Sequence, residues 1–280
     1  MSRKQSVLHD HDHDRGLMHD LELIHARMGR RRMLGFLAGA SLVPLIGCAQ
    51  KLASGAGAGG AAAGSGSEET GGSCANIPSE TGGPYPGDGS NGVNALVLTG
   101  IVRSDIRSSI AGVTGTAEGV PLEVKLRLLN AADGCAPLEG YAIYLWHCDR
   151  DGNYSLYSLP GQNYLRGVQE TDADGTVTFK TIFPGCYSGR MPHIHFEVYP
   201  GLSAATASGN KLHTSQLAFP NDVSNTVYAS SGYGTSVGNF SRISFETDNV
   251  FSDGVSLQMA SLTGSVSAGY VATLDVGIAD

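Results

Sequence analysis

Hydrophobic and polar residues alternate in several short stretches of this 280-residue chain. The clearest stretch is residues 122–129, where Leu122, Val124 and Leu126 share one face and charged residues separate them. Alternation with a period of two is the pattern of a half-buried β-strand. Further strand-like runs are predicted at Ala95–Val102, Tyr141–His147, Thr176–Ile182, Ile194–Tyr199, Ser241–Glu246, Val255–Leu262 and Tyr270–Val276.

Turn residues separate these runs. Asp172–Gly175, directly before the strand predicted at Thr176, is a typical turn signal. The chain holds 39 glycines, and no amphipathic helix of convincing length interrupts residues 95–199. Many short strands joined by turns predict an all-β domain, either a sandwich or a barrel. This domain is expected to occupy residues 74–280 without a second boundary.

The first 47 residues have the layout of an export signal. The three arginines Arg30–Arg32 precede an apolar run that is too short for a membrane span of about 20 residues. The arginines resemble a twin-arginine signal, and Leu45–Cys48 resembles a lipobox. Cys48 is therefore predicted to be lipidated, giving an exported, membrane-anchored lipoprotein on the periplasmic or cell-surface side. An ordinary secretory signal with a coincidental cysteine is the alternative.

The residues between the predicted anchor and the domain are rich in Gly, Ala and Ser. Such a composition buries too little apolar surface to fold, so residues 48–73 are predicted to be a flexible linker. The whole chain has a formal net charge of −8 and no basic segment within the predicted domain. This charge distribution argues against a nucleic-acid partner and is compatible with a small neutral substrate.

Two histidines lie close together in Arg190–Phe196. On a strand, side chains two residues apart point the same way, so His193 and His195 can reach one metal ion. A His-x-His pair alone is a weak signal. Here it accounts for two of the four histidines that follow residue 47, and Tyr187 lies just upstream in a Pro-Gly-Cys-Tyr turn.

Tyr154 is the second tyrosine of interest, because it follows a turn after the predicted strand that ends at His147. Phenolate is a hard anionic ligand that suits Fe(III). Two phenolates with two imidazoles would offset most of its charge, so this donor set favours ferric iron over zinc or copper. For any single tyrosine, packing is the commoner role, and the prediction rests on the combination of Tyr154, Tyr187, His193 and His195.

Four cysteines follow Cys48: Cys74, Cys135, Cys148 and Cys186. An even number in an oxidising compartment suggests up to two disulfides with three possible pairings. A Cys148–Cys186 bridge would brace the predicted metal site, and buried free thiols are the alternative. No Cys-x-x-Cys spacing of the zinc type occurs.

The two motif regions together resemble the intradiol ring-cleavage dioxygenases, a family that includes protocatechuate 3,4-dioxygenase and catechol 1,2-dioxygenase. The resemblance rests on Leu138–Gly140, Leu145–Asp149, Gly152–Tyr154, Pro184–Tyr187 and Arg190–Phe196. Glu80–Tyr85 resembles the segment that precedes the family's core. The resemblance covers roughly residues 76–220 and implies a β-sandwich with extensive loops.

The same resemblance implies a role for each matching residue. Tyr154 is the tyrosine ligand that stays bound, Tyr187 is the ligand that leaves when substrate arrives, and His193 and His195 are the imidazole ligands. Arg190 and Gln216 would then lie beside the substrate ring, where Arg190 stabilises developing charge. The implied reaction uses non-heme Fe(III) and O₂ to cleave a catechol-type ring to a muconate-type diacid.

One departure from the family concerns the segment between Tyr187 and Arg190. Only Ser188 and Gly189 lie there, whereas the familiar enzymes have a longer segment that lines the substrate pocket. The short segment suggests a more open site. It also leaves two alternatives: a prealbumin-like binding module at the cell surface without chemistry, and an iron-binding relative that has lost ring cleavage.

Overall fold

The alternating stretch at residues 122–129 forms β1 (Pro121–Asn130), the strand around which the first sheet is built. On one side β1 pairs in parallel with β9 (Gly269–Ile278), and β9 pairs with β8 (Ser261–Ser265). On the other side β1 pairs with β5 (Thr176–Ile182) and, at its end, with the short β2 (Ala136–Pro137).

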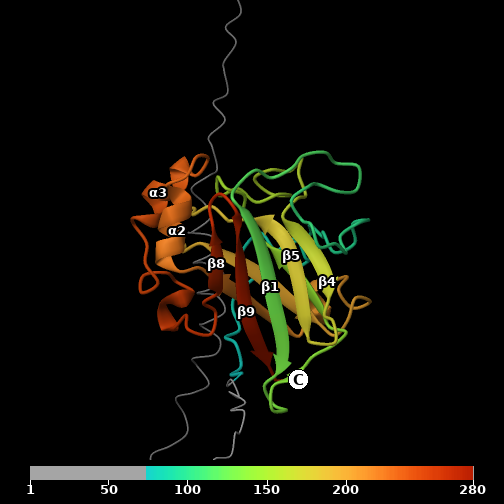
Figure 1. The fold of residues 1–280 in the computed structure, drawn as a ribbon. Helices are drawn as coiled ribbons and strands as arrows, with labels where there is room; N and C mark the ends of the chain where they lie inside the picture. Colours follow the sequence, from blue (N-terminus) through green and yellow to red (C-terminus); the bar gives the residue numbers. More distant parts are fainter. Residues whose placement is uncertain (1–73, 280) are drawn as a thin grey trace, which may run out of the picture. The chain divides into compact units, whose positions relative to one another are not determined.

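A second sheet has the order β4 (Arg166–Glu170), β3 (Ala142–Trp146), β6 (His193–Tyr199) and β7 (His213–Ala218), with every pair antiparallel. The two sheets face each other as a sandwich in the computed structural model, which describes residues 74–279 (Figure 1). The all-β sandwich predicted from the sequence is therefore confirmed. The predicted signal peptide, lipobox and linker lie outside the described residues.

The space between the sheets is filled by the alternating apolar residues. On β6, for example, Ile194, Phe196 and Val198 are fully buried and belong to this core. From the first sheet, the residues that pack in the same core include Leu122, Val124, Leu126 and Leu128 of β1. Burying a side chain of this size stabilises the fold by about 1.5–3 kcal/mol, so the two alternating faces fix the register of each strand.

The outer face of the second sheet is covered as well. Every residue of β3 and β6 is buried, although only alternate residues reach the core between the sheets. Tyr144 and Trp146, on the outer face of β3, pack in a second cluster with Ala95, Leu96 and Tyr154 from loops. The loops thus convert the outer face of this sheet into a buried layer, and His193 and His195 lie within it.

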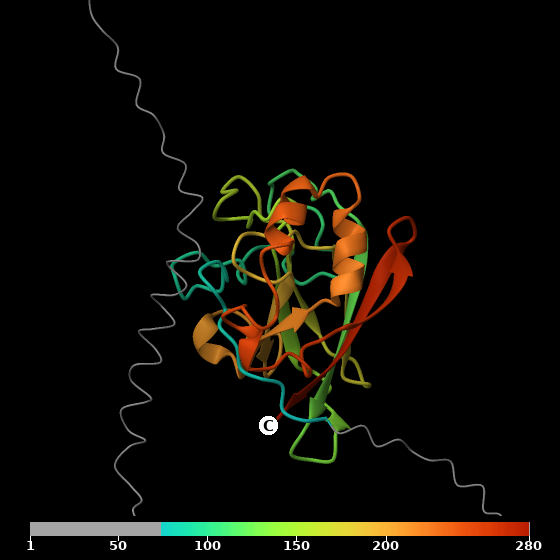
Figure 2. The same cartoon turned by 90° about the vertical axis from the view of Figure 1, so that its left-hand side faces the viewer.

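Several sequence-based elements are corrected by the structure. Ala95–Val102 and Ser241–Glu246 were predicted as strands but consist mainly of turns, and Val255–Leu262 joins a strand only from Ser261. Two short helices, α2 (Asn221–Tyr228) and α3 (Gly234–Phe240), were missed. Figures 1 and 2 show both helices together at one side of the sandwich. Val227 and Tyr228 bury one face of α2 in the core, so packing outweighs the weak helix propensity of this sequence.

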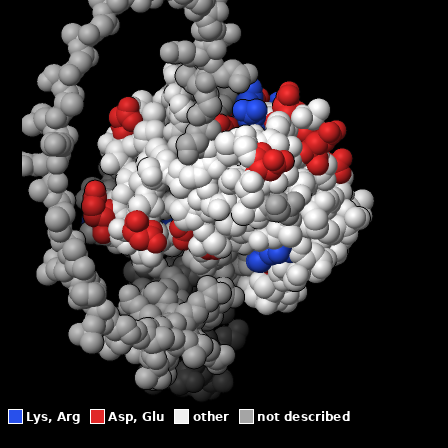
Figure 3. Space-filling view, turned by 90° about the horizontal axis from the view of Figure 1, so that it is seen from below, with Lys and Arg blue, Asp and Glu red and all other residues white. Residues whose placement is uncertain are grey.

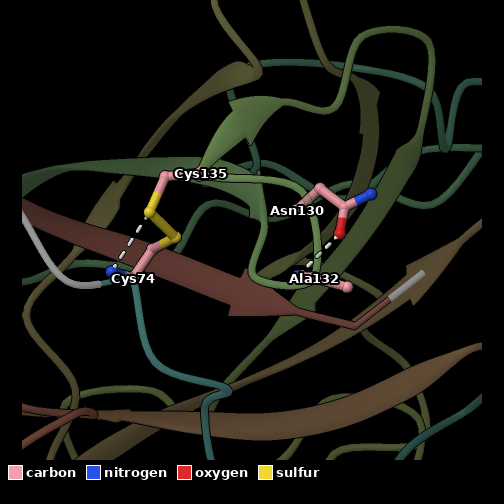
Figure 4. Close-up of a disulfide and its surroundings, with 4 residues drawn as sticks. All are labelled: Cys74, Asn130, Ala132 and Cys135. Carbon is pink, nitrogen blue, oxygen red and sulfur yellow. Dashed lines mark hydrogen bonds between the residues drawn. A yellow bond between two sulfur atoms is a disulfide. The ribbon is translucent and has the colours of Figure 1, made fainter.

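A disulfide joins Cys74 to Cys135, 61 residues apart, at the end of β1 (Figure 4). Cys148 and Cys186 are free and buried, so the suggested bridge between them is wrong. Their thiols point at separate backbone carbonyls, those of Gly185 and Arg190, each at 3.4 Å. Burial raises the pKa of Cys186 to about 12, which keeps this thiol protonated at neutral pH.

Loss of the Cys74–Cys135 bridge should lower the free energy of unfolding by about 2–4 kcal/mol, because the bridge closes a long loop in the unfolded chain. Cys74→Ser, Cys135→Ser and the double variant should show the same loss in guanidinium unfolding, since each removes the same bond. Wild-type protein unfolded with a reductant present is the control. A double variant as stable as the oxidised wild type would contradict this expectation.

No helix within the described part of the chain is long and apolar enough to span a membrane. The end of the domain seen in Figure 3 carries separated acidic groups and no broad basic area.

Candidate metal centre

Four aromatic side chains form a closed ring on the outer face of the second sheet. Going round the ring, the centroids are 4.6 Å apart for His193–His195, 6.4 Å for His195–Tyr154, 6.0 Å for Tyr154–Tyr187 and 5.7 Å for Tyr187–His193. The structure thus brings together all four ligands predicted from the sequence, from one strand and two loops.

The two histidines owe their shared direction to the pleat of β6. Nε2 of His193 lies 3.0 Å from Nε2 of His195 and 3.2 Å from the phenol oxygen of Tyr187. On its other side, Nδ1 of His193 lies 2.6 Å from the carbonyl oxygen of Met191, an acceptor that places the ring proton on Nδ1 and leaves Nε2 as a lone-pair donor.

The two tyrosines differ in their surroundings. Tyr154 is 3% exposed, and its phenol oxygen has no hydrogen-bond partner within the described residues. Tyr187 is half-buried, and it packs beside Gly152, where a Cβ would lie 3.0 Å from the Cβ of Tyr187. Gly152 also has φ of +88°, a conformation that favours glycine, so this residue lets the two tyrosine loops meet.

Burial sets the protonation of the cluster. It lowers the pKa of His193 and His195 well below the usual value, with help from the positive charge of Arg190, so both imidazoles are neutral and able to bind a metal. Burial also raises the pKa of Tyr154 well above 10. A buried phenol of this kind ionises only when a strong positive charge lies beside it.

These features fit a ferric ion. Two nitrogens that bind one ion at about 2.1 Å cannot be more than about 4.2 Å apart, and the observed 3.0 Å satisfies this limit. The unpartnered oxygen of Tyr154 would gain a partner. Within residues 74–279, no group of three or more His, Cys, Asp or Glu is placed to hold a metal, so a metal here would depend on the tyrosines. Their hard oxygen donors favour Fe(III).

Arg190 is held beside this cluster by a buried polar network. Its Nε lies 3.0 Å from a carboxylate oxygen of Asp248, and its Nη2 donates to the side-chain oxygen of Gln216 at 2.7 Å. Gln216 in turn donates to the carbonyl of Thr81 at 2.9 Å. Within the described chain these hydrogen bonds use Nε and Nη2 of Arg190.

A segment that we call the cover segment, residues 80–87, crosses the metal centre. A Cβ built on Gly83 would lie 3.6 Å from Cε1 and 3.9 Å from Nε2 of His195. The ring of Tyr85 packs on that of Tyr154 with centroids 5.1 Å apart. The cover segment therefore closes the side of the cluster that faces His195 and Tyr154, and Tyr187 is the more accessible of the four aromatic residues.

Comparison with known proteins agrees with this geometry. A sequence profile described as "Dioxygenase" matches residues 103–231, which include all four aromatic residues of the cluster. An intradiol ring-cleavage dioxygenase from Tetranychus urticae superposes with a TM-score of 0.57 at 28% identity, over 74% of this chain and 95% of that one. The chain is thus similar to the intradiol ring-cleavage dioxygenases in sequence and in fold.

Two curated relatives of this dioxygenase family are similar over a shorter region. Chlorocatechol 1,2-dioxygenase of Rhodococcus opacus is 33% identical over 107 residues, covering 31% of this chain and 39% of the relative. Catechol 1,2-dioxygenase 2 of Acinetobacter lwoffii is 32% identical over 117 residues, covering 34% and 42%. The chain thus spans about two fifths of the length of the curated relatives it matches. The alternative of a prealbumin-like binding module finds no support in these matches.

Two residues that support the aromatic cluster were not singled out from the sequence. Asp248, which fixes Arg190, lies beyond the matched region in a segment that was predicted to be turns and strands. Arg166, which is fully buried beside the Tyr154 loop, begins a strand that was not predicted. Neither position carries a local pattern that would have singled it out, because their partners are distant in the sequence.

Glu80, at the start of the cover segment, should make stability depend on pH. Burial, and then the negative charge of Asp253, raise its pKa from 4.5 to about 7. The folded state therefore binds this proton more tightly than the unfolded state, so ionisation of Glu80 removes stability as pH rises from about 4.5 to about 7. The effect is reduced by partial exposure, because solvent screens the charge.

The variant Glu80→Gln cannot ionise, so it should gain stability relative to wild type between pH 5 and pH 8. Urea unfolding of the metal-free proteins at several pH values measures this difference. Glu139→Gln, at an exposed position, is the matched control. A difference between Glu80→Gln and wild type that stays constant with pH would show that Glu80 does not titrate in this range.

Proposed function

We propose that this chain is a non-heme Fe(III)-dependent intradiol dioxygenase that cleaves a catechol-type ring with O₂ and gives a muconate-type diacid. The observation that carries the proposal is the closed ring of Tyr154, Tyr187, His193 and His195 with the buried cation Arg190 beside it. A binding module has no need for a buried arginine beside a tyrosine–histidine cluster.

Each ligand has a defined task in this proposal. His193 and His195, both neutral, would hold the ion together with Tyr154, which is buried and packed against Tyr85. When bound, the ferric ion supplies Lewis acidity and a template that holds the diol beside O₂. Tyr187 is half-buried, so among the residues that would hold the ion it is the one that a diol could reach, and its phenol oxygen would be placed to accept a proton from the diol.

Arg190 supplies fixed positive charge where the ring gains electron density. Its guanidinium is oriented before substrate arrives, because Asp248 and Gln216 hold two of its nitrogens. A charge that needs no reorganisation during the reaction is worth more in a buried site than in water. The overall reaction adds both atoms of O₂ to one diol, so it needs no external reductant.

The short turn between Tyr187 and Arg190 affects the size of the substrate that the site can accept. Ser188 is exposed, and Gly189 has φ of +84°, so the chain reverses here within two residues. A longer segment would cover the Tyr187 side of the site. We therefore expect the site to accept catechols with bulky substituents, which a panel of substituted catechols would test by the ratio of kcat/KM values.

The decisive experiment uses the purified protein with stoichiometric Fe(III). Two tyrosinate ligands should give a broad visible charge-transfer band that moves to longer wavelength when catechol is added without O₂. Admitting O₂ should then consume one O₂ per catechol and give a muconate-type diacid. A band that responds to catechol without O₂ uptake would point to the iron-binding relative that has lost ring cleavage. Protein that stays colourless after ferric loading would overturn the proposal.

A further inference from the structure

Arg166 is the first residue of β4 and lies in the same cross-strand row as the metal centre. The strand register pairs Arg166 with Trp146, Trp146 with His195, and His195 with Gln216. These four side chains therefore follow one line across the sheet. Arg166 has no exposed surface, which is unusual for an arginine.

The guanidinium of Arg166 makes a hydrogen bond with each of its five N–H groups. Nε donates to the Ser155 hydroxyl at 3.0 Å, and Nη2 donates to the carbonyls of Ser155 and Tyr85 at 3.0 and 2.9 Å. Nη1 donates to the Pro86 carbonyl at 2.7 Å and to the Tyr144 hydroxyl at 3.0 Å. All these acceptors are neutral, and no ion pair joins Arg166 to an acidic side chain within residues 74–279.

The acceptors belong to the segments that place Tyr154. Ser155 follows Tyr154 directly, and Arg166 holds both its hydroxyl and its carbonyl. Tyr85 and Pro86 belong to the cover segment, and the ring of Tyr85 packs on Tyr154. One planar group thus fixes the loop that carries Tyr154 and the segment that covers it.

A second route runs from Arg166 to the imidazole side of the centre. The Tyr144 hydroxyl accepts from Arg166 and donates to the Pro86 carbonyl at 2.7 Å. The ring of Tyr144 stacks on Trp146 with centroids 4.9 Å apart, and Trp146 stacks on His195 at 4.9 Å with an interplanar angle of 4°. Movement of Arg166 would therefore be passed to His195 through two stacked rings.

The backbone leaves little freedom around this group. A Cβ on Gly87 would lie 2.9 Å from Nη1 of Arg166, closer than a Cβ atom approaches another heavy atom in folded proteins. The chain beside Pro86 must therefore be glycine for Arg166 to keep its position. This close packing indicates that the position of Gly87 depends on the planar shape of the Arg166 guanidinium.

We propose that Arg166 is a positioning residue of the metal centre: the planar fork of its guanidinium fixes Tyr154 and His195 relative to each other. The inference rests on the proposed iron site and assigns a task to a residue outside the ligand set. Because every acceptor is neutral, the role depends on the geometry of five N–H donors rather than on charge. Lysine keeps the charge but has only three donors on one atom, so it cannot replace arginine here.

The test compares Arg166→Lys and Arg166→Met with the same changes at Arg127, an exposed arginine on β1. Iron retention against a chelator and the position of the tyrosinate charge-transfer band are measured for each full-length protein. Both Arg166 variants should retain iron about 10–100-fold more weakly and show a displaced band, since outer partners of metal ligands have effects of this size. Both Arg127 variants should match wild type.

A milder variant covers the case in which Arg166→Met fails to fold. Tyr144→Phe keeps the stacked ring and removes the hydroxyl that bridges Arg166 and Pro86, while the direct hydrogen bond between them stays, so it should displace the band in the same direction by a smaller amount. A wild-type band in both Tyr144→Phe and a folded Arg166 variant would overturn the inference. So would full rescue by Arg166→Lys. A colourless wild type would instead overturn the proposed iron site itself, and this inference with it.

Discussion

Replacing His193 by alanine should leave a folded domain that no longer holds ferric iron. His193 lies at the centre of the cluster, with its Nε2 within 3.2 Å of both His195 and Tyr187. Outer partners of metal ligands contribute about 10–100-fold to metal affinity, so loss of a ligand should weaken iron binding by more than about 100-fold. The visible band and the ring cleavage should disappear together.

The fold should survive this change, because His193 points away from the core between the sheets. Iron content after ferric loading, the visible spectrum and far-UV circular dichroism measure the three expected properties. His213→Ala, on neighbouring β7, is the control, since His213 contacts the Pro78 carbonyl instead of the cluster. A His193→Ala protein that remains coloured would remove His193 from the ligand set, and with it the four-ligand centre.

Replacing Asp248 by asparagine should cause the largest loss of stability among single changes near the site. Asp248 has no exposed surface and pairs with the equally buried Arg190. Its carboxylate also accepts hydrogen bonds from the backbone N–H groups of Met191, Val250 and Phe251. Removing one partner of a buried ion pair costs about 3–5 kcal/mol, because the remaining charge stays buried without compensation.

Thermal and urea unfolding of Asp248→Asn measure this loss, and Asp222→Asn, at an exposed position of α2, is the matched control. The variant should also turn over catechol more slowly, because Arg190 loses the group that orients it. Iron binding should be affected less than turnover, since Asp248 contacts no ligand side chain. A stability within about 0.5 kcal/mol of wild type, the range of surface changes, would contradict the role given to the pair.

Strand prediction succeeded where burial on one face imposes alternation. Residues 122–129 and 176–182 became β1 and β5 because their apolar residues face the core between the sheets. It failed at Ala95–Val102, where the apolar residues cover the outer face of the second sheet from turns. Covering a sheet needs apolar side chains but no strand pairing, so the same composition adopts another structure.

The candidate site was predictable to the extent that its residues lie close together in the sequence. His193 and His195 are neighbours on one strand, and Tyr154 and Tyr187 follow turns with recognisable chemistry. The roles of Asp248 and Arg166 became visible only in the structure. Asp248 contacts Arg190 across 58 residues of sequence, and Arg166 contacts Pro86 across 80. The disulfide likewise pairs cysteines that only the sheet brings together.

The disulfide has a mechanical consequence for the metal centre. Cys74 lies only nine residues before Gly83, which packs against His195, so strain applied at the start of the domain could travel along the backbone to the centre. The disulfide to Cys135 transfers this force to β1, a ten-residue strand that is hydrogen-bonded to a neighbouring strand on each side. The chain from Cys74 to Pro86 is thus fixed at its start by the disulfide and at its end by Arg166, so tension on the chain bypasses the aromatic cluster.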